Sequence, residues 1–375
     1  DEYASLLSED FVNASFEFHG RTLSGTQELR PRWKRGLSLV SSLLGEAMGE
    51  IWVSRHFPAA NKEIMDGLVR SLLDAYEQAL THCEWMGEET RAQALKKLST
   101  FTPKIGYPDQ WIDYSSLHFD SDSLVDAVEA ATRFHVQRRW DKLGGPVDRS
   151  EWHMTPQTVN AYYDPTMNEI VFPAAILQAP FFDPDADEAS NFGAIGAVIG
   201  HEIGHGFDDQ GSRFDAEGNL ENWWTDEDRE RFEERTKRLV DQYDALTPRD
   251  LQGEEPPLHV NGALTLGENI GDLAGLSIAW QAYVARLARK GFTPQSAPEI
   301  DGQSAAQRFF TAWARGWRTA IRREYAKQLL SIDPHSPAEF RCNQIVANMD
   351  PFAEAYDVAP GDDLWIASEE RVHIW

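Results

Sequence analysis

The sequence predicts a mainly α-helical fold with a small β-sheet. Long stretches repeat apolar residues at positions i, i+3, i+4 and i+7, which share one face of a helix. One short region, residues 159–172, instead holds two β-rich runs separated by a turn. The 375 residues, 42% of them hydrophobic, are enough for two or three domains with a large core.

The first part of the chain, residues 1–155, is predicted to be a helical segment. Its clearest helix covers residues 62–82, where apolar side chains line one face. Further helices are predicted over residues 37–57, 88–98 and 123–143. Residues 101–111 contain two X-Pro pairs and Gly106, so this stretch is predicted to be a loop or a domain boundary.

The second part, residues 156–375, is predicted to be a separate domain that begins with a hairpin. Residues 159–163 and 169–172 are its strands, and Asp164-Pro165 marks the turn. Thr225 followed by Asp228 resembles a capping box, which predicts the start of a charged helix. The other predicted helices cover residues 191–209, 267–290 and 305–330.

The most informative motif lies in the helix predicted over residues 191–209. His201-Glu202-Ile203-Gly204-His205 is an H-E-x-x-H pattern, and residues four apart lie on one face of a helix. Both imidazoles can therefore bind one metal ion, while Glu202 can reach a water bound to that ion. A pair of ordinary core histidines would explain the same letters.

Glycines around this motif argue against ordinary core histidines. They are Gly193, Gly196, Gly200, Gly204 and Gly206. Each glycine costs a helix about 1 kcal/mol relative to alanine, so together they cost roughly 4 to 5 kcal/mol. We therefore expect the helix to be buried against close neighbours through the stripe Gly196, Gly200 and Gly204, and to be held by packing and by zinc.

A catalytic zinc site needs a third protein ligand and an open position for water. Glu268 is the candidate, and it lies four residues before Asp272 at the start of a predicted helix. Acids in a first turn also favour the helix dipole, which is an ordinary structural explanation. Spacing alone leaves Asp208, Asp209 or another acid open as third ligand. Asp208 and Asp272 are also candidates to orient the ligand histidines.

The composition excludes several classes of function. A formal charge of −26 without a basic stripe argues against a nucleic-acid partner and against binding to an anionic membrane surface. No stretch approaches the run of about 20 apolar residues that crosses a bilayer. The two cysteines, Cys83 and Cys342, are too few for a disulfide scaffold and leave the compartment open.

Five segments occur together and in order along the second part. They are Val-Asn-Ala-Tyr-Tyr (159–163), Phe-Pro-Ala-Ala-Ile-Leu-Gln-Ala-Pro-Phe-Phe (172–182), His-Glu-Ile-Gly-His-Gly-Phe-Asp-Asp (201–209), Gly-Glu-Asn-Ile-Gly-Asp (267–272) and His-Ser-Pro-Ala-Glu-Phe-Arg (335–341). With these motifs the chain resembles the neprilysin and endothelin-converting-enzyme family of zinc metallopeptidases. The resemblance implies a thermolysin-like catalytic domain over residues 156–375, preceded by helical segments of a lid domain.

The resemblance also assigns roles to residues. It implies one zinc ion per chain held by His201, His205 and Glu268, with Glu202 as the general base that activates the zinc-bound water. It further implies that Asp208 and Asp272 orient the histidines and that His335 stabilises the oxyanion. The implied substrate-binding residues are Asn160, Ala161, Arg341, Ile176, Phe181, Val198 and Trp317. Without the resemblance, the apolar members of this set would be predicted as core and Arg341 as part of a surface ion pair.

The implied function is a zinc endopeptidase that cleaves short peptides on the N-terminal side of hydrophobic residues. Because family members are about twice as long, the resemblance implies that an N-terminal half is missing, and the lack of a cysteine near Trp375 points to a bacterial-type member. One alternative is an inactive metal-binding fragment that needs that half or a partner chain. Another is a secreted thermolysin-like peptidase, against which the glycine-rich helix speaks. An extracytoplasmic or secreted location is favoured by the resemblance, while a cytoplasmic one, the natural substrate and the oligomeric state stay open.

Overall fold

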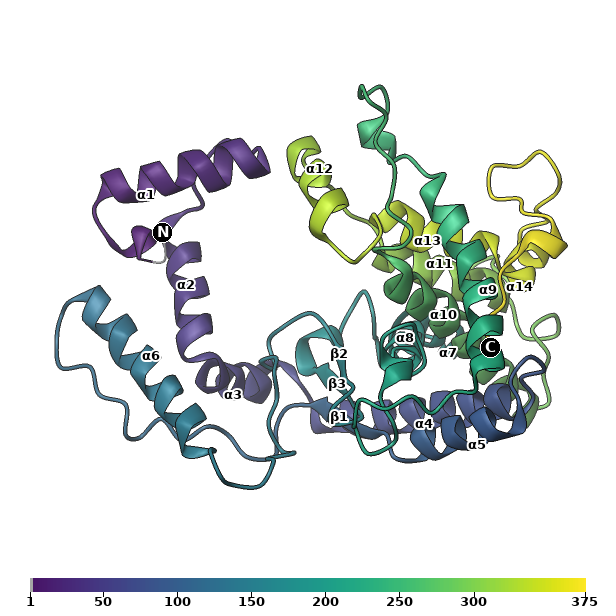
Figure 1. Cartoon of the computed structure of the whole chain (residues 1–375), viewed down its shortest axis with the longest axis horizontal. Helices are drawn as coiled ribbons and strands as arrows, with labels where there is room; N and C mark the ends of the chain where they lie inside the picture. The colour runs from purple at the N-terminus through teal and green to yellow at the C-terminus, as the bar shows by residue number, and fades with distance from the viewer. Residues whose placement is uncertain (1–2) are drawn as a thin grey trace.

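Helix α10 (Leu266–Arg289) lies at the centre of the fold, which a computed structural model describes for residues 3–375. It packs against α8 (Ala197–Gly204), which carries most of the H-E-x-x-H motif, and against α4 (Ala59–Thr81), which runs below both in Figure 1. A single hydrophobic cluster extends through the three helices, and Leu72, Ile199 and Leu276 are fully buried in it. The helices predicted over residues 62–82 and 267–290 therefore pack around the helix that carries the motif.

Glycines allow α8 and α10 to approach each other backbone to backbone. A Cβ added to Gly200 would lie 2.7 Å from the carbonyl oxygen of Gly275, and one added to Gly275 would lie 2.5 Å from the amide nitrogen of His201. Gly204 also faces α10. The predicted glycine stripe is confirmed at Gly200 and Gly204, whereas Gly196 lies against its own helical segment.

The helical segment around the motif is shorter than predicted. It consists of α7 (Glu188–Asn191), a π-helical turn (Phe192–Gly196) and α8, and His205 is already the C-cap. The predicted end at residue 209 is wrong. The Asp208 carboxylate accepts hydrogen bonds from the backbone amides of Gln210 and Gly211, and these bonds form a tight turn where the helix would otherwise continue.

The sheet has three strands in the order β1-β3-β2. β2 (Tyr162–Asp164) pairs antiparallel with β3 (Glu169–Pro173), so the predicted hairpin is confirmed with a shorter first strand. β1 (Thr102–Gly106) runs parallel to β3, with Ile105 opposite Phe172, so the loop predicted over residues 101–111 is wrong there. Proline fits because β1 is an edge strand, where its missing N–H breaks no ladder bond, and Gly106, at a φ of 86°, ends the strand.

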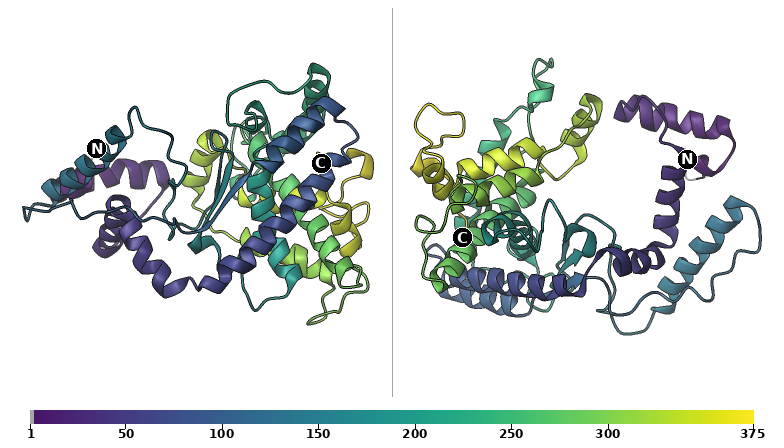
Figure 2. Two further views of the ribbon diagram at one scale, coloured as in Figure 1. Left: turned by 90° about the horizontal axis from the view of Figure 1, so that it is seen from below. Right: turned by 180° about the vertical axis from the view of Figure 1, so that it is seen from behind.

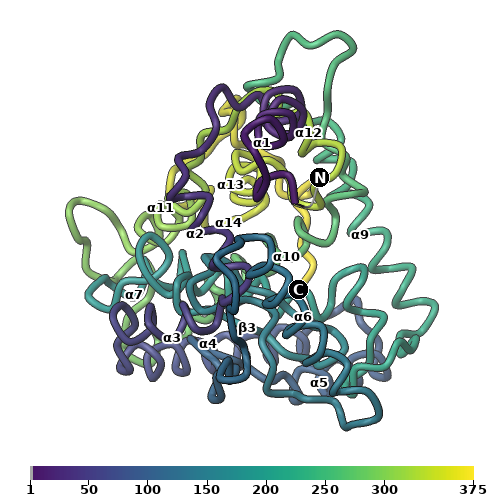
Figure 3. Tube along the Cα trace, turned by 90° about the vertical axis from the view of Figure 1, so that its left-hand side faces the viewer, coloured from purple at the N-terminus to yellow at the C-terminus, as the bar shows by residue number. Residues whose placement is uncertain are grey.

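The N-terminal helices form an arm beside this core (Figure 1 and Figure 2). The arm holds α1 (Glu9–Ser15), the π-helical η2 (Phe16–Leu23), α2 (Arg32–Leu43), α3 (Gly45–His56) and α6 (Leu124–Asp141). Its far end returns toward the core, where η2 contacts α12 (Arg323–Ile332), and Figure 3, seen from the side of the arm, shows the arm in front of the core. The helix predicted over residues 37–57 is two helices, because the backbone leaves the helical conformation at Leu44.

The remaining helices complete the core. They are α5 (Glu88–Ser99), α9 (Asp226–Asp244), α11 (Ala305–Gly316), α13 (Ala338–Ala347) and α14 (Asp350–Ala355). The predicted start of α9 is confirmed, since the Thr225 side chain accepts a hydrogen bond from the amide of Asp228, but the capping box is incomplete because the Thr225 amide donates to Thr90 instead. The continuous helix predicted over residues 305–330 is wrong: it breaks between α11 and α12, where Trp317 instead packs on Trp313 and under Arg341.

The core extends across the domain boundary that the sequence predicts at residues 155 and 156. The same cluster contains Met65, Leu98 and Ile105 from the first part and Phe172 and Ile270 from the second. The boundary itself stays a prediction. In the part of the chain that the structure describes, no helix is both long and apolar enough to cross a membrane.

Candidate active site

Helices α8 and α10 bring His201, His205 and Glu268 together. One ligand atom from each residue lies within 4.8 Å of the others. Nε2 of His201 is 3.2 Å from Oε2 of Glu268, and Nε2 of His205 is 3.8 Å from Oε1 of Glu268. A tetrahedral ion with bonds of about 2.0 to 2.2 Å separates its ligand atoms by roughly 3.3 to 3.6 Å, so the geometry fits zinc.

The electrostatics of these three residues also fit a cation. Oε2 of Glu268 is buried and makes no hydrogen bond of good geometry. Burial raises the pKa of Glu268, but the neighbouring His201 and His205 outweigh burial and hold this pKa well below its usual range. Burial lowers the pKa of His201, but Asp272 and Glu268 outweigh burial and raise it to about 10. The negative charges of Glu268 and Asp272 thus favour positive charge at this place, as a bound metal ion would supply.

Each ligand histidine has a second carboxylate behind it. Nδ1 of His205 lies 2.7 Å from Oδ2 of Asp208, and Nδ1 of His201 lies 2.9 Å from Oδ1 of Asp272. Both carboxylates are almost fully buried. Such contacts fix the tautomer and the angle of a ligand imidazole. Asp208 and Asp209, which spacing left open as third ligands, lie outside the triad, and Asp209 packs against Gly267 instead.

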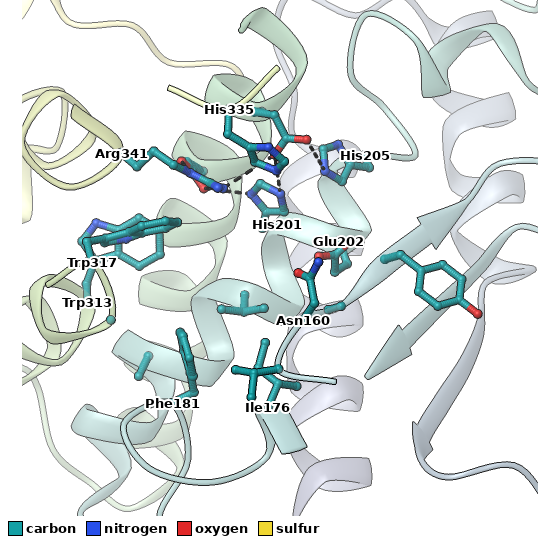
Figure 4. Close-up of a pocket in the computed structure, with 18 of the residues that line it drawn as sticks. Asn160, Ile176, Phe181, His201, Glu202, His205, Trp313, Trp317, His335 and Arg341 are labelled. Carbon is teal, nitrogen blue, oxygen red and sulfur yellow. Dashed lines mark hydrogen bonds and ion pairs between the residues drawn. The ribbon is translucent and has the colours of Figure 1, made fainter. Parts of the chain in front are cut away.

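Glu202 lies on the cavity side of α8. Its side chain is buried, and Figure 4 shows it beside Asn160 below the two histidines. Burial raises the pKa of Glu202, while the charges of His201 and His205 counteract that rise. A carboxylate with a raised pKa close to the triad is suited to accept and return a proton.

Arg341, at the first turn of α13, does not form the surface ion pair that the residues alone predict. Its Nε and Nη2 donate to the two carboxylate oxygens of Asp272, each at 2.7 Å. The guanidinium lies 4.2 Å above the ring of Trp317, and Nη2 is 3.6 Å from Oε2 of Glu268. The side chain is only 12% exposed, so the pair lies inside the site. The role of Arg341 toward substrate stays a prediction.

His335 approaches the triad from the loop before α13. Its Nε2 is 3.2 Å from Oε2 of Glu268, and its Nδ1 is 2.8 Å from Oδ1 of Asp333. The next residue anchors the loop, because the Ser336 hydroxyl donates to Oδ1 of the buried Asn269 at 2.7 Å. The side chain of His335 is 46% exposed, so it is open to a substrate as well as to Glu268.

One cavity of about 450 Å³ unites the site. Figure 4 shows the histidines on one side of it and Phe181, Ile176 and Trp317 on the other. Its lining includes the predicted site residues Asn160, Ala161, Ile176, Phe181, Val198, His201, Glu202, His205, Glu268, Asp272, Trp317, His335 and Arg341. The other predicted residue, Asp208, lies behind His205. The structure therefore brings the predicted residues together, while their individual roles stay predictions.

Sequence reasoning missed Asp333 and Trp313. Asp333 stands two residues before His335, and a carboxylate at that distance from a candidate histidine is a signal that could have found it. Trp313 lines the cavity and lies four residues before Trp317, a spacing that places two residues on one face of a helix. No sequence signal marks Lys97, whose contacts are described below.

Comparisons with known proteins agree with this geometry. Two models of peptidase family M13 match residues 160–372 and 1–108. A neutral endopeptidase of Lactococcus lactis is 37% identical over 358 residues, which cover 95% of this chain and 54% of the relative. Endothelin-converting enzyme 1 of Mus musculus is 37% identical over 369 residues, which cover 96% of this chain and 47% of the relative.

Solved structures show the same likeness. The zinc metalloprotease Zmp1 of Mycobacterium tuberculosis, in complex with an inhibitor, superposes with a TM-score of 0.95 at 55% identity. That match covers 100% of this chain and 56% of the other. PepO of Lactobacillus rhamnosis gives a TM-score of 0.87 at 33% identity and covers 100% of this chain and 56% of the other.

The chain thus spans about half the length of the relatives it matches. The two family models nevertheless cover most of its residues, and the matched range 160–372 contains His201, His205 and Glu268. The chain belongs to peptidase family M13, the neprilysin and endothelin-converting-enzyme family of zinc metallopeptidases.

Proposed function

We propose that the chain is a zinc-dependent endopeptidase that hydrolyses short peptides on the N-terminal side of hydrophobic residues. The observation that carries this proposal is the meeting of His201, His205 and Glu268 in one cavity with Glu202. Two imidazoles and one carboxylate are three protein ligands, which leaves a fourth tetrahedral position for water or substrate.

The protein's own groups supply the proton transfer. When bound, zinc supplies Lewis-acid chemistry: it lowers the pKa of a coordinated water to about 7 and polarises a carbonyl. Glu202 would accept the proton of the attacking water and then give it to the departing amine. Asp208 and Asp272 would keep His205 and His201 in the tautomer that presents Nε2 to the ion.

His335 would donate to the negative charge that develops on the substrate carbonyl oxygen. Its contact with Asp333 fixes the ring so that Nε2 points toward the triad. A donor held at such a position stabilises the transition state more than the substrate, since the charge is absent before the attack. Removing one donor of this kind typically lowers kcat by about 10²- to 10³-fold.

The substrate would lie along the free edge of the sheet. Among the residues that the structure describes, β2 pairs with β3 alone, so its other edge has no strand partner, and Asn160 and Ala161 precede it at the cavity. An extended peptide can add to such an edge as an antiparallel strand through backbone hydrogen bonds. This placement would carry the scissile carbonyl past Glu202.

The apolar part of the cavity supports a preference for a hydrophobic residue after the cleaved bond. Ile176, Phe181, Val198 and Trp317 contribute side chains to it, and Trp313 adds a further indole. Burying one large apolar side chain there would contribute about 1.5 to 3 kcal/mol. An acidic residue in that position would lose this contribution and leave its charge poorly solvated.

A quenched fluorescent peptide tests the proposal. We expect the zinc-loaded protein to cleave before a phenylalanine, to cleave the matched aspartate peptide at least tenfold more slowly, and to stop on chelation. Glu202→Gln should keep zinc and lose hydrolysis by several orders of magnitude. Turnover retained by that variant would contradict the assignment of the base.

A longer chain is the control for the alternative. The relatives are about twice as long as this chain, so the assay should be repeated on any longer form of the protein that the gene encodes. Activity in a longer form only would show that this chain binds metal but needs the added region. Zinc binding without activity in either form would contradict the proposed function.

A further inference from the structure

Lys97, on the inner face of α5, carries a fully buried ammonium group. Its Nζ donates to the carbonyl oxygens of Gly206 and Gly211 at 2.7 Å each and of Phe214 at 2.8 Å. An ammonium has three N–H donors, so this contact uses all of them. Burial lowers the pKa of Lys97 to about 7, while the charges of Asp208 and Asp215 counteract part of that change.

All three acceptors belong to residues 206–214, the loop that follows His205. This loop also contains Asp208, which contacts Nδ1 of His205 through Oδ2 and accepts the amide of Gly211 through Oδ1 at 2.7 Å. The two ends of the Gly211 residue are thus held by two different groups, its N–H by Asp208 and its C=O by Lys97. Lys97 and Asp208 are therefore coupled through one short piece of backbone.

The loop has little freedom to find another arrangement. A Cβ at Gly211 would lie 1.7 Å from the carbonyl oxygen of His205, so the loop packs directly on the end of the ligand helix. Aromatic rings of Tyr163, Phe207 and Trp223 lie 5.8 to 6.0 Å from Nζ of Lys97. These rings shield the ammonium from water, so solvent cannot replace its hydrogen bonds when the lysine is removed.

We propose that Lys97 is a positioning residue for the metal site: it holds the 206–214 loop so that Asp208 orients His205 toward the ion. Lys97 does not line the cavity and is not one of the three candidate metal ligands, so its effect passes through the loop. The inference rests on the proposed zinc site but does not depend on peptidase activity.

The test is the zinc affinity of Lys97→Met, measured by competition with a chromophoric chelator on protein shown to be folded by circular dichroism. Methionine keeps most of the length of lysine and removes every donor. Loss of groups that orient a ligand histidine typically weakens metal binding by about 10- to 100-fold, and we expect a loss in that range. An affinity within about twofold of the wild type would overturn the proposal.

Lys104→Met is the matched control. Lys104 is less deeply buried than Lys97, and its Nζ donates to the carbonyl oxygen of Glu151 at 2.7 Å and to Glu169 at 2.8 Å, outside the 206–214 loop. We expect Lys104→Met to lose stability and to keep its zinc affinity. Equal losses of affinity in both variants would assign the effect to general destabilisation and overturn the proposal.

A double-mutant cycle with Asp208→Ala tests the route. If Lys97 acts through Asp208, the zinc affinity of the double variant should be close to that of Asp208→Ala alone. Additive losses would show that Lys97 acts by another path and contradict the inference. If Lys97→Met does not fold, Lys97→Gln replaces it. The amide nitrogen of glutamine lies one bond closer to the backbone than Nζ of lysine and has two donors, so it cannot hold the three carbonyls. An unchanged zinc affinity of Lys97→Gln would likewise contradict the proposal. A wild type that binds no zinc would instead refute the proposed function.

Discussion

Arg341 and Asp272 form a bidentate ion pair directly behind His201. Both N–H···O distances are 2.7 Å, and Oδ1 of Asp272 also lies 2.9 Å from Nδ1 of His201. The arginine thus holds the carboxylate that lies against the histidine. Because Asp272 is almost fully buried, its charge depends on these partners.

Arg341→Leu should therefore destabilise the protein. Removing one partner of a buried pair leaves an uncompensated charge, which typically costs about 3 to 5 kcal/mol. Urea unfolding of the metal-free protein measures this loss. Adding Asp272→Asn should recover part of it, since the remaining amide is neutral. A double variant less stable than Arg341→Leu would show that the ion pair is not the source of the loss.

Gly200→Ala should also destabilise the fold. The new methyl would lie 2.7 Å from the backbone oxygen of Gly275, which cannot rotate away, so α8 and α10 would have to separate. Overpacking of this kind costs about 1 to 3 kcal/mol. The control is Gly67→Ala on α4, where no atom lies within 4 Å of the added Cβ and a gain of up to about 1 kcal/mol is expected. Thermal unfolding of both variants gives the comparison, and a neutral Gly200→Ala would contradict the close helix crossing.

Stability should fall in acid because of Asp228. Burial raises the pKa of this carboxyl, but hydrogen bonds from Thr90 and from the amide of Gly87, together with the charge of Arg231, hold it below its usual value. A carboxyl whose pKa is lower in the folded state than in the unfolded state stabilises the folded protein. This contribution is complete above the unfolded pKa of about 3.9 and is lost as the pH falls through the folded pKa.

The measurement for Asp228 is the free energy of unfolding between pH 6 and pH 2. Asp228→Asn should be less stable at pH 6 and should converge with the wild type toward pH 2, because both then carry a neutral group. A constant difference between the two proteins over this range would show that the ionised carboxylate contributes nothing beyond the shape of the side chain.

His335→Phe should lower kcat by about 10²- to 10³-fold, because the donor toward the developing oxyanion is lost. Zinc content should stay at the wild-type value, since the side chain lies outside the ligand triad and is half exposed. Steady-state kinetics and metal analysis on the same preparation give both values. A variant that lost its zinc would show that His335 supports the metal site instead.

The sequence predicted the elements whose signals are local. The apolar stripe of α4, the cap at Thr225 and the H-E-x-x-H spacing depend on neighbours within one or two helical turns. The family resemblance then supplied Glu268, which spacing had left among several acids. Residues that act locally or in recognisable motifs were therefore predictable.

Long-range contacts were not predictable in the same way. β1 becomes a strand only because β3, more than sixty residues later, offers it a partner, and its own Pro103 suggests a loop. Lys97 reads as one charge on a charged helix, although three carbonyls more than a hundred residues away surround its ammonium. The contact of Arg341 with Asp272 likewise joins two helices that no spacing rule connects.

X-ray absorption at the zinc edge, with metal analysis of the same sample, tests the central claim most directly. The account predicts one zinc ion per chain, bound by two imidazole nitrogens, one carboxylate and one solvent oxygen, and loss of the carboxylate signal in Glu268→Ala. Protein that takes up no zinc, or zinc whose coordination shell is filled by protein atoms and is unchanged in Glu268→Ala, would contradict it.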